Sequence, residues 1–341
     1  MTLEQRLPTP GHMTIFRDIL CGVDGTRSAY EAVRQAAVLA LPDGHLTLLA
    51  ATDIRGSGPF ETALVAPAVA RKALGHARRL AAQAGVNSTR RTVSTGRAYE
   101  VLLAAARQHT LLALGAPTMS RLAQLIVGGI ASEAAHALPS SLLVARRPPP
   151  HRRFAERIMV ASDASEHSDA LVDFAARLAS ARESSLVLFH APFAESSMHP
   201  TRIAAQAEHL RRGLGDLVTL RVDPGHPHNA IVSAAAREEV SLLLVASRRP
   251  RGLRALGSVS ERLVHDAPCS VFILRHARCP VLISPVPATH RSHATPSRRN
   301  YRGSAHGVRG QSPRWSATAA TSSGAGTSMP CSARLPGAAT R

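Results

Sequence analysis

The sequence predicts an α/β fold with two tandem doubly wound domains, each an open five-stranded parallel sheet with helices on both faces. The first observation is an internal repeat, because residues 17–26 (RDILCGVDGT) return as residues 156–165 (ERIMVASDAS). Both copies lead into an alanine-rich helical pattern. This repetition indicates that the same structural unit occurs twice in the chain. The second observation is the alternation of short apolar runs with helical patterns, which is typical of parallel strands joined by right-handed crossovers.

The first copy contains five apolar runs that we expect to be strands. They are residues 15–23, 45–51, 89–94, 111–115 and 141–144. Helical spacing predicts helices at residues 28–40, 67–84, 98–108 and 132–137. Ser28 and Glu31 have the spacing of a capping box, which predicts that Ser28 caps the first helix. The second strand is continuously apolar over several residues, as expected for a strand covered by helices on both faces.

The second copy follows the same order. Its later strands are expected at residues 185–190, 218–222, 242–246 and 270–274, and its later helices at residues 200–214, 228–238 and 260–266. The apolar positions of the first helix recur 139 residues later, from Val33 to Val172, whereas Gly96 recurs as Gly225 after 129 residues. The first copy therefore carries ten extra residues in its middle.

These patterns divide the chain into five segments. We expect a disordered N-terminus at residues 1–13, a first domain at 14–147, a Pro/Arg linker at 148–153, a second domain at 154–283 and a disordered tail at 284–341. The tail is rich in Arg, Ser and Ala without periodicity, a composition that cannot bury enough apolar surface to fold. Met13 lies just before the first strand and is a second candidate for the start of translation.

Composition and charge restrict the class of protein. The chain of 341 residues has a formal net charge of +18, and no uninterrupted apolar run is long enough to cross a bilayer. Ten arginines lie after Asp266, where no acidic residue occurs, and aromatic residues make up only 3% of the chain. Because a base-stacking platform needs aromatic side chains, we expect no dedicated nucleic-acid site. Because no apolar run is long enough to cross a bilayer, we also expect no membrane partner.

The cysteines favour a reducing compartment. Cys21, Cys269, Cys279 and Cys331 form no C-x-x-C pair, and two of them lie on expected strands, where a thiol acts as a small hydrophobic group. A redox or metal-binding thiol is the alternative, but no context that would lower a thiol pKa is visible. We therefore expect a cytoplasmic protein with no metal site.

Asp24 and Asp163 end the first strand of each copy. Ligands of open parallel sheets bind outside the carboxyl ends of the strands, where strand order reverses, and a carboxylate there can accept from a ribose hydroxyl or an adenine amine. The alternative is that each aspartate accepts backbone amides of its own loop, a common use of Asp-Gly-Thr and Asp-Ala-Ser. The sequence leaves both interpretations open.

The loop after the fourth strand is the second candidate element. In the first copy Gly115 is followed by Thr118 and the pair Gly128-Gly129, and in the second copy Ala246 is followed by Arg249 and the pair Gly257-Ser258. Glycines here would let the backbone approach a phosphate, and free amides at the start of the next helix would bind the anion.

Other candidates are weaker. His226 and His228 on a turn could ligate a metal, but two histidines without a third donor are expected to be surface residues. Arg248, Arg251 and Arg254, together with Arg249, could clamp phosphates, with a solvated charged loop as the alternative. No Ser-His-Asp arrangement, paired carboxylates or nucleophile elbow specifies an active site.

Through the repeated aspartate and the glycine loops, the chain resembles the universal stress proteins in their tandem two-domain form. The resemblance covers about residues 14–283, and its most specific stretch is residues 257–271 (GSVSERLVHDAPCSV). ATP-binding members have an aspartate ending the first strand and the pattern G-x2-G-x9-G-[ST] after the fourth. The resemblance implies a strand order of 3-2-1-4-5 in each domain, with the fifth strands paired in an intramolecular pseudo-dimer or a homodimer.

The resemblance also implies two sets of residues that contact an adenine nucleotide. They are Gly22, Val23, Asp24, Gly115, Thr118, Gly128 and Gly129 in the first domain, and Ser162, Asp163, Ala246, Arg249, Gly257, Ser258, Val259 and Ser260 in the second. Thr118 and Gly129 depart from the family pattern, as do Ala246 and Arg249, and the second loop is two residues shorter. The first domain keeps the nine-residue interval, so ATP is expected there rather than in the second.

The expected function is that of a stress-response regulator that binds an adenine nucleotide such as ATP at the carboxyl end of the sheet. The alternative is an interaction or dimerisation module that binds no nucleotide, which the departures from the family pattern favour. We expect no enzymatic activity, and slow ATP hydrolysis rests on the resemblance alone. The sequence identifies no protein partner.

Overall fold

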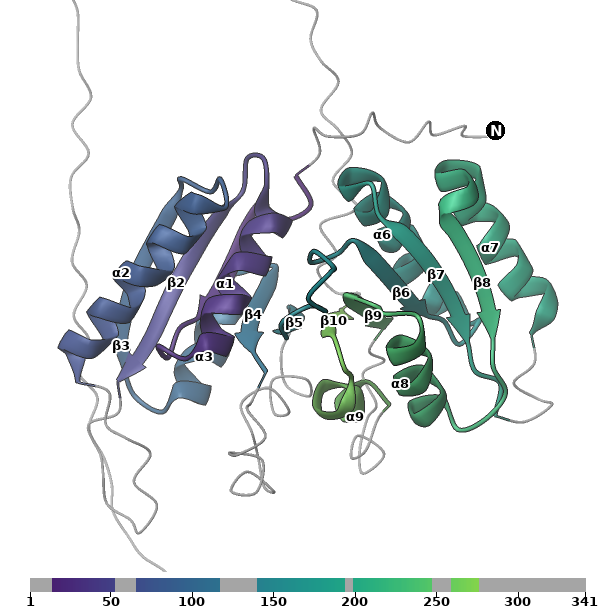
Figure 1. Cartoon of the computed structure of the whole chain (residues 1–341). Coiled ribbons are helices and arrows are strands. Elements are labelled where there is room, and N and C mark those ends of the chain that lie inside the picture. Colours follow the sequence, from purple (N-terminus) through teal and green to yellow (C-terminus); the bar gives the residue numbers. More distant parts are fainter. Residues whose placement is uncertain (1–13, 53–65, 117–139, 194–198, 247–258, 276–341) are drawn as a thin grey trace, which may run out of the picture. The chain divides into compact units, whose positions relative to one another are not determined.

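The structure is a computed structural model that describes residues 14–52, 66–116, 140–193, 199–246 and 259–275. Figure 1 shows strands and helices alternating along the chain in both repeats. The expected helix at 132–137, the short N-terminal segment and the tail lie outside the described residues.

The first repeat contains the elements that the apolar pattern predicts. They are β1 (Asp18–Gly22), α1 (Arg27–Ala40), β2 (His45–Thr52), α2 (Pro67–Gln83), β3 (Thr89–Thr95), α3 (Ala98–Ala106), β4 (Leu111–Gly115) and β5 (Ser141–Ala145). The β1 strand is shorter than expected, since it begins at Asp18 rather than at residue 15. The other bounds differ from the predicted ones by at most two residues.

The second repeat has the same order of elements. They are β6 (Arg157–Ala161), α6 (Glu166–Arg182), β7 (Ser185–His190), α7 (Pro200–Leu214), the 3-10 turn η2 (Gly215–Leu217), β8 (Val218–Val222), α8 (Pro227–Arg237), β9 (Leu242–Ala246), α9 (Val259–Asp266) and β10 (Ser270–Leu274). The four later strands match their predicted bounds, because each is a continuous apolar run that turn residues delimit.

The strands form one sheet in the order β3-β2-β1-β4-β5-β10-β9-β6-β7-β8. Each repeat therefore has the expected order 3-2-1-4-5, and all pairs within a repeat are parallel. The repeats join through antiparallel pairing of β5 with β10, in the register Leu143↔Phe272. The expected pairing of the fifth strands is thus made within one chain, as a pseudo-dimer.

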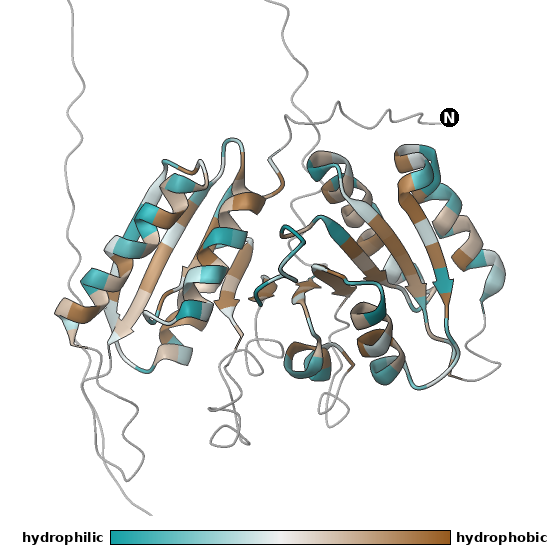
Figure 2. Ribbon diagram, viewed as in Figure 1, coloured by the Kyte–Doolittle hydropathy of each residue, from teal (hydrophilic) through white to brown (hydrophobic). Residues whose placement is uncertain are grey.

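Helices cover both faces of the sheet, as predicted. Of the described helices, α1, α2, α6 and α7 pack into the core on one face, and α3, α8 and α9 pack into the core on the other. Figure 2 shows hydrophobic residues along the strands and hydrophilic residues on the outer sides of the helices. The repeated helix positions Val33 and Val172 are both buried, so the two copies do build one helix face alike.

The predicted cap of α1 is wrong by two residues. Thr26, not Ser28, is the N-cap, and its Oγ accepts from the N–H of Ala29 at 3.2 Å. Glu31 bonds to the side chains of Arg34 and Gln35 instead of reaching back to the cap. Ser28 and Glu31 have capping-box spacing, but Thr26 precedes them and already has the extended backbone that a cap requires.

None of the helices that the structure describes is both long enough and apolar enough to span a bilayer. The two cysteines that it describes, Cys21 and Cys269, are buried and form no disulfide. Cys21 lies on β1 as expected, and Cys269 directly precedes β10.

Candidate ligand-binding site

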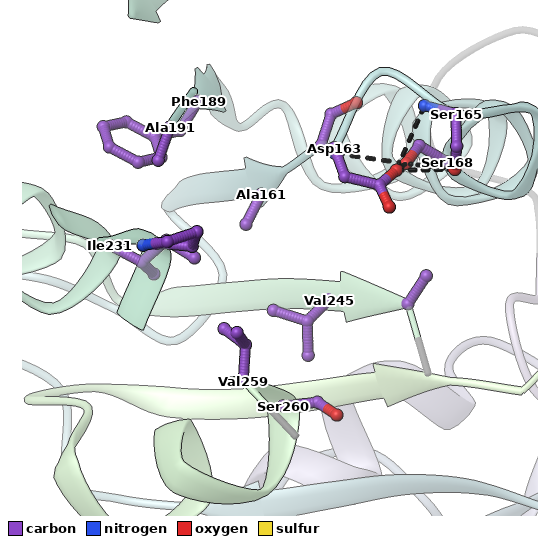
Figure 3. A pocket seen from close by; sticks show the side chains of 13 residues that line it. Ala161, Asp163, Ser165, Ser168, Phe189, Ala191, Ile231, Val245, Val259 and Ser260 are labelled. Carbon is purple, nitrogen blue, oxygen red and sulfur yellow. Dashed lines mark hydrogen bonds between the residues drawn. The ribbon is translucent and has the colours of Figure 1, made fainter. Parts of the chain in front are cut away.

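The second repeat contains a cavity of about 210 Å³ at the carboxyl ends of β6, β7 and β9. It is lined by Ala161, Ser162, Asp163, Ser165, Ser168, Phe189, Ala191, Pro227, Ile231, Val245, Ala246, Val259 and Ser260. Figure 3 shows the apolar side chains of Phe189 and Val245 on strands and that of Ile231 on a helix, with the polar side chains of Asp163, Ser165 and Ser168 together at one side. This is the place where an open parallel sheet takes its ligand.

The carboxylate of Asp163 is held by the first turn of α6. Its Oδ1 accepts from the N–H of Ser165 at 3.1 Å, from Ser165 Oγ at 2.6 Å and from Ser168 Oγ. The equivalent Asp24 accepts from the N–H of Thr26 at 2.9 Å and from Thr26 Oγ at 2.6 Å. Both aspartates therefore cap their own loops through one oxygen. A carboxylate has about four lone-pair sites on two oxygens, so this role is compatible with ligand binding.

The turn that carries Asp163 has a left-handed residue. Ala164 has φ of 56°, where the first repeat has Gly25 with φ of 84°. The N–H of Ala164 donates to Ser162 Oγ at 3.0 Å, and Ser162 Oγ donates to Gln206 Oε1 of α7 at 2.7 Å. The buried Ser162 thus links the aspartate turn to α7, and its hydroxyl group is used in these two structural hydrogen bonds.

The first repeat places its predicted residues at the corresponding strand ends, but glycines there serve packing. A Cβ at Gly115 would lie 2.4 Å from the carbonyl carbon of Ser28, so Gly115 allows α1 to approach β4. A Cβ at Gly22 would lie 2.7 Å from Leu114 Cδ2 and 3.3 Å from Leu102 Cδ2. Leucine side chains therefore fill the space beside Gly22, while its counterpart Ala161 faces the cavity.

In the first repeat, the ring of Tyr30 on α1 meets the ring of His76 edge-on, with the ring centroids 4.5 Å apart. Burial raises the pKa of Tyr30, the Asp24 carboxylate raises it further, and Arg79 opposes both. The Tyr30 phenol thus stays protonated at neutral pH and is a hydrogen-bond donor close to Asp24.

The structure brings some of the predicted residues together. Ser162, Asp163, Ala246, Val259 and Ser260 all line the cavity. In the first repeat the buried Val23 immediately follows β1, and Asp24 is exposed. The remaining predicted residues lie outside the described part of the chain: Thr118, Gly128, Gly129, Arg249, Gly257 and Ser258, with Arg248, Arg251 and Arg254 of the same loop.

The two histidines of the α8 turn have different surroundings. His226 is exposed as expected, but His228 is buried, contrary to the prediction of a surface residue. Its Nε2 lies 2.8 Å from Asp266 Oδ2, and its Nδ1 lies 2.9 Å from Asn229 Oδ1. The side chain thereby links α8 to the end of α9. Within the described ranges, no three His, Cys, Asp or Glu side chains gather in a way that could hold a metal ion.

The sequence did not identify the apolar walls of the cavity. Phe189 and Ala191 lie at the carboxyl end of β7, and Ile231 lies on α8, four residues after Pro227. Their apolar character predicts burial but does not distinguish a cavity wall from a filled core. Ser165 and Ser168 had a visible signal, because each is a hydroxyl residue shortly after the repeated aspartate.

The duplicated doubly wound sheet, with an aspartate after the first strand of each repeat, defines a class of tandem α/β proteins. Within that class, a sequence profile of the universal stress protein family matches residues 15–146 and 155–275. The chain belongs to the universal stress protein family. No curated protein matches it at significant similarity.

Solved structures share the fold. A universal stress protein from Archaeoglobus fulgidus DSM 4304 is 15% identical with a TM-score of 0.62, and the match covers 76% of this chain and 98% of that one. A protein from Pseudomonas aeruginosa UCBPP-PA14 is 15% identical with a TM-score of 0.57, over 76% and 94%. A universal stress protein solved in complex with cAMP is 25% identical, over 37% of this chain and 99% of that one, with a TM-score of 0.32.

Proposed function

We propose that the protein is a stress-response regulator that binds an adenine nucleotide at the carboxyl end of the second repeat's sheet. The observation that carries the proposal is the cavity of about 210 Å³, which joins apolar walls to the polar group of Asp163, Ser165 and Ser168. Pockets for drug-sized ligands measure roughly 300–1,000 Å³. The described walls therefore suit a base and part of its ribose, with the phosphates extending beyond them.

The chemistry of the walls assigns roles to the residues. The flat base would contact Phe189, Ile231 and Val245. Transfer of the base from water to these apolar walls lowers the free energy of the complex. The Asp163 carboxylate, already oriented by its loop, would accept a hydrogen bond from a ribose hydroxyl. Ser260 in the first turn of α9 lies where backbone amides attract anions.

The proposal differs from the sequence-based expectation about which repeat binds ATP. Leu102 and Leu114 fill the space beside Gly22, and contact with the α1 backbone accounts for Gly115. Both observations favour the second repeat. The proposal includes a cytoplasmic location and a binding role without catalysis. The cysteine spacing, which forms no C-x-x-C pair, favours a reducing compartment.

The alternative function is an interaction module that binds no nucleotide. The departures at Ala246 and Arg249 from the family pattern favour it. Dimerisation of two chains through their fifth strands is a weaker form of this alternative, because β5 and β10 already pair with each other.

Isothermal titration of the full chain with ATP tests the proposal. Asp163→Asn keeps a side-chain oxygen for the Ser165 turn but removes the charge. We expect it to weaken binding by about 1.5–3 kcal/mol, the contribution of a hydrogen bond to a charged group. Asp24→Asn is the matched control in the other repeat and should bind ATP like the unaltered protein.

Two results would contradict the proposal. Absence of heat at high micromolar ATP would remove nucleotide binding and leave the interaction module. Loss of binding in Asp24→Asn with full binding in Asp163→Asn would move the site to the first repeat.

A further inference from the structure

Arg146 follows β5 directly and lies at the junction of the two repeats. Its N–H donates to Ser270 Oγ at 3.0 Å, and its carbonyl oxygen accepts from Gln35 Nε2 at 2.7 Å. Ser270 Oγ also lies 2.8 Å from Gln35 Oε1, which completes a network of three residues. Because Gln35 and Ser270 are buried and come from different repeats, the backbone of Arg146 is fixed against both.

The side chain of Arg146 crosses from the first repeat to the end of α9 in the second. Its Nη2 donates to the carbonyl oxygens of Val264 at 2.5 Å and His265 at 2.9 Å, and Nη1 donates to that of Cys269 at 3.5 Å. The last carbonyls of a helix lack partners within the helix and carry a partial negative charge. The guanidinium supplies these partners, and this compensates for the burial that lowers the pKa of Arg146.

The other end of α9 forms part of the cavity. Val259 and Ser260 line it, while Leu263 and Val264 are buried in the core. With eight residues, α9 is about 12 Å long, and helices this short are not stable without external contacts. One short rigid element therefore connects the Arg146 guanidinium to the cavity wall.

The arrangement has a counterpart in the other direction. Arg275 follows β10 at the position equivalent to Arg146, and its N–H donates to Ser141 Oγ at 3.2 Å. Arg275 is buried, whereas Arg146 is partly buried. The backbone hydrogen bond from the residue after each fifth strand to the first serine of the opposite fifth strand is thus a repeated feature of the junction.

We propose that Arg146 is a positioning residue for the ligand site of the second repeat, which it holds in shape through α9 from the first repeat. This inference rests on the proposed nucleotide site. Because coupling between two sites is reciprocal, a ligand that tightens the α9 wall also tightens the junction between the repeats. The first repeat then acts as a regulator of binding in the second.

The test compares Arg146→Met with Arg182→Met in the full chain. Arg182 also crosses between repeats, where it donates to the carbonyl oxygens of Val38 and Leu41 at the end of α1, but α1 contributes no residue to the cavity lining. The first measurement is hydrogen exchange of residues 259–266 without ligand. The second is the Kd for ATP by titration calorimetry.

We expect Arg146→Met to speed exchange in residues 259–266 about tenfold and to raise the Kd about tenfold, whereas Arg182→Met changes neither. If methionine at this position prevents folding, Arg146→Lys replaces it. Lysine keeps the charge but lacks the fork that reaches several carbonyls, so a smaller loss of protection is expected.

Unchanged exchange in residues 259–266, or an equal loss in Arg182→Met, would overturn the inference. Faster exchange with an unaltered Kd would also overturn it, because α9 would then be loosened without consequence for the site. If the unaltered protein binds no ATP, the proposed function fails, and the exchange measurement still decides whether Arg146 fixes α9.

Discussion

The ring of Phe16 in the first repeat lies 5.9 Å from the ring of Phe174 in the second, and both meet Phe272 of β10. All three side chains are fully buried. The cluster spans residues far apart in the sequence, so the cores of the two repeats share one apolar contact.

Phe16→Ala is expected to lower the free energy of unfolding by about 3–5 kcal/mol, since it removes a large buried ring. Circular dichroism during urea denaturation should show one transition in which both repeats lose helix together. Phe193→Ala is the control, because Phe193 is 67% exposed and its loss should change stability by about 0.5 kcal/mol or less. Two separate transitions in Phe16→Ala, with the second unchanged, would contradict the shared core.

Two glycines should respond oppositely to the same substitution. Gly25 has φ of 84°, so Gly25→Ala places a side chain in the left-handed region at a cost of about 1–2 kcal/mol. Gly75 lies inside α2 with open space around it, so Gly75→Ala should stabilise the protein by roughly 0.5–1 kcal/mol. Thermal unfolding of both variants checks this. A loss of stability in Gly75→Ala would show that the helix packs more tightly there than described.

Gly115→Ala is expected to destabilise the protein by about 1–3 kcal/mol, because its Cβ would overlap the backbone of Ser28 and Ala29. The substitution must push α1 away from β4 and disturb the Asp24 turn. Urea denaturation measures the loss, with Gly75→Ala as a control for the added methyl group. If Gly115→Ala is as stable as the parent, the close approach of α1 to β4 is wrong.

Stability in acid should depend on Glu238. Burial raises the pKa of this carboxyl group, but its pairing with Arg157 and Arg221 outweighs burial, so the net pKa lies below the ordinary value of 4.5. A lowered carboxyl pKa stabilises the fold at pH values above the unfolded pKa, and the contribution is lost as pH falls through the folded pKa.

Glu238→Gln should therefore be less stable than the parent at neutral pH, and the difference should shrink on acidification below about pH 4.5. Urea denaturation at several pH values gives the difference directly. Glu208→Gln, at an exposed position of α7, controls for the loss of one charge. A difference that stays constant from neutral pH into acid would contradict the assigned ion pairs.

The buried thiols should resist modification in the folded protein. Burial raises the pKa of Cys21, and burial raises the pKa of Cys269 to about 12 despite the nearby Arg146. In a Cys279→Ser, Cys331→Ser variant, a thiol-reactive disulfide reagent should react with neither remaining cysteine until denaturant is added. Rapid stoichiometric reaction of the native protein would mean that one of them is accessible.

The sequence predicted the sheet well because its signals are local. The apolar run Ser185–His190 and the repeated aspartates follow directly from strand pattern and repetition. The cap at Thr26 was missed because two overlapping hydroxyl residues satisfy capping rules and only backbone conformation decides between them. The cavity was predicted only in part, since whether Ile231 and Val245 fill space or border it depends on side chains from four other elements, β6, α6, β7 and α9. The inter-repeat contacts of Arg146 leave no local signal at all.

The antiparallel pairing of β5 with β10 has a consequence for how the protein behaves on dilution. When two separate chains meet through such strands, the complex dissociates as their concentration falls. Here the two repeats belong to one chain and a short linker joins them. Tethering of this kind corresponds to an effective concentration that can reach the millimolar range. The paired sheet should therefore persist at whatever copy number the cell maintains, even when only a few molecules are present.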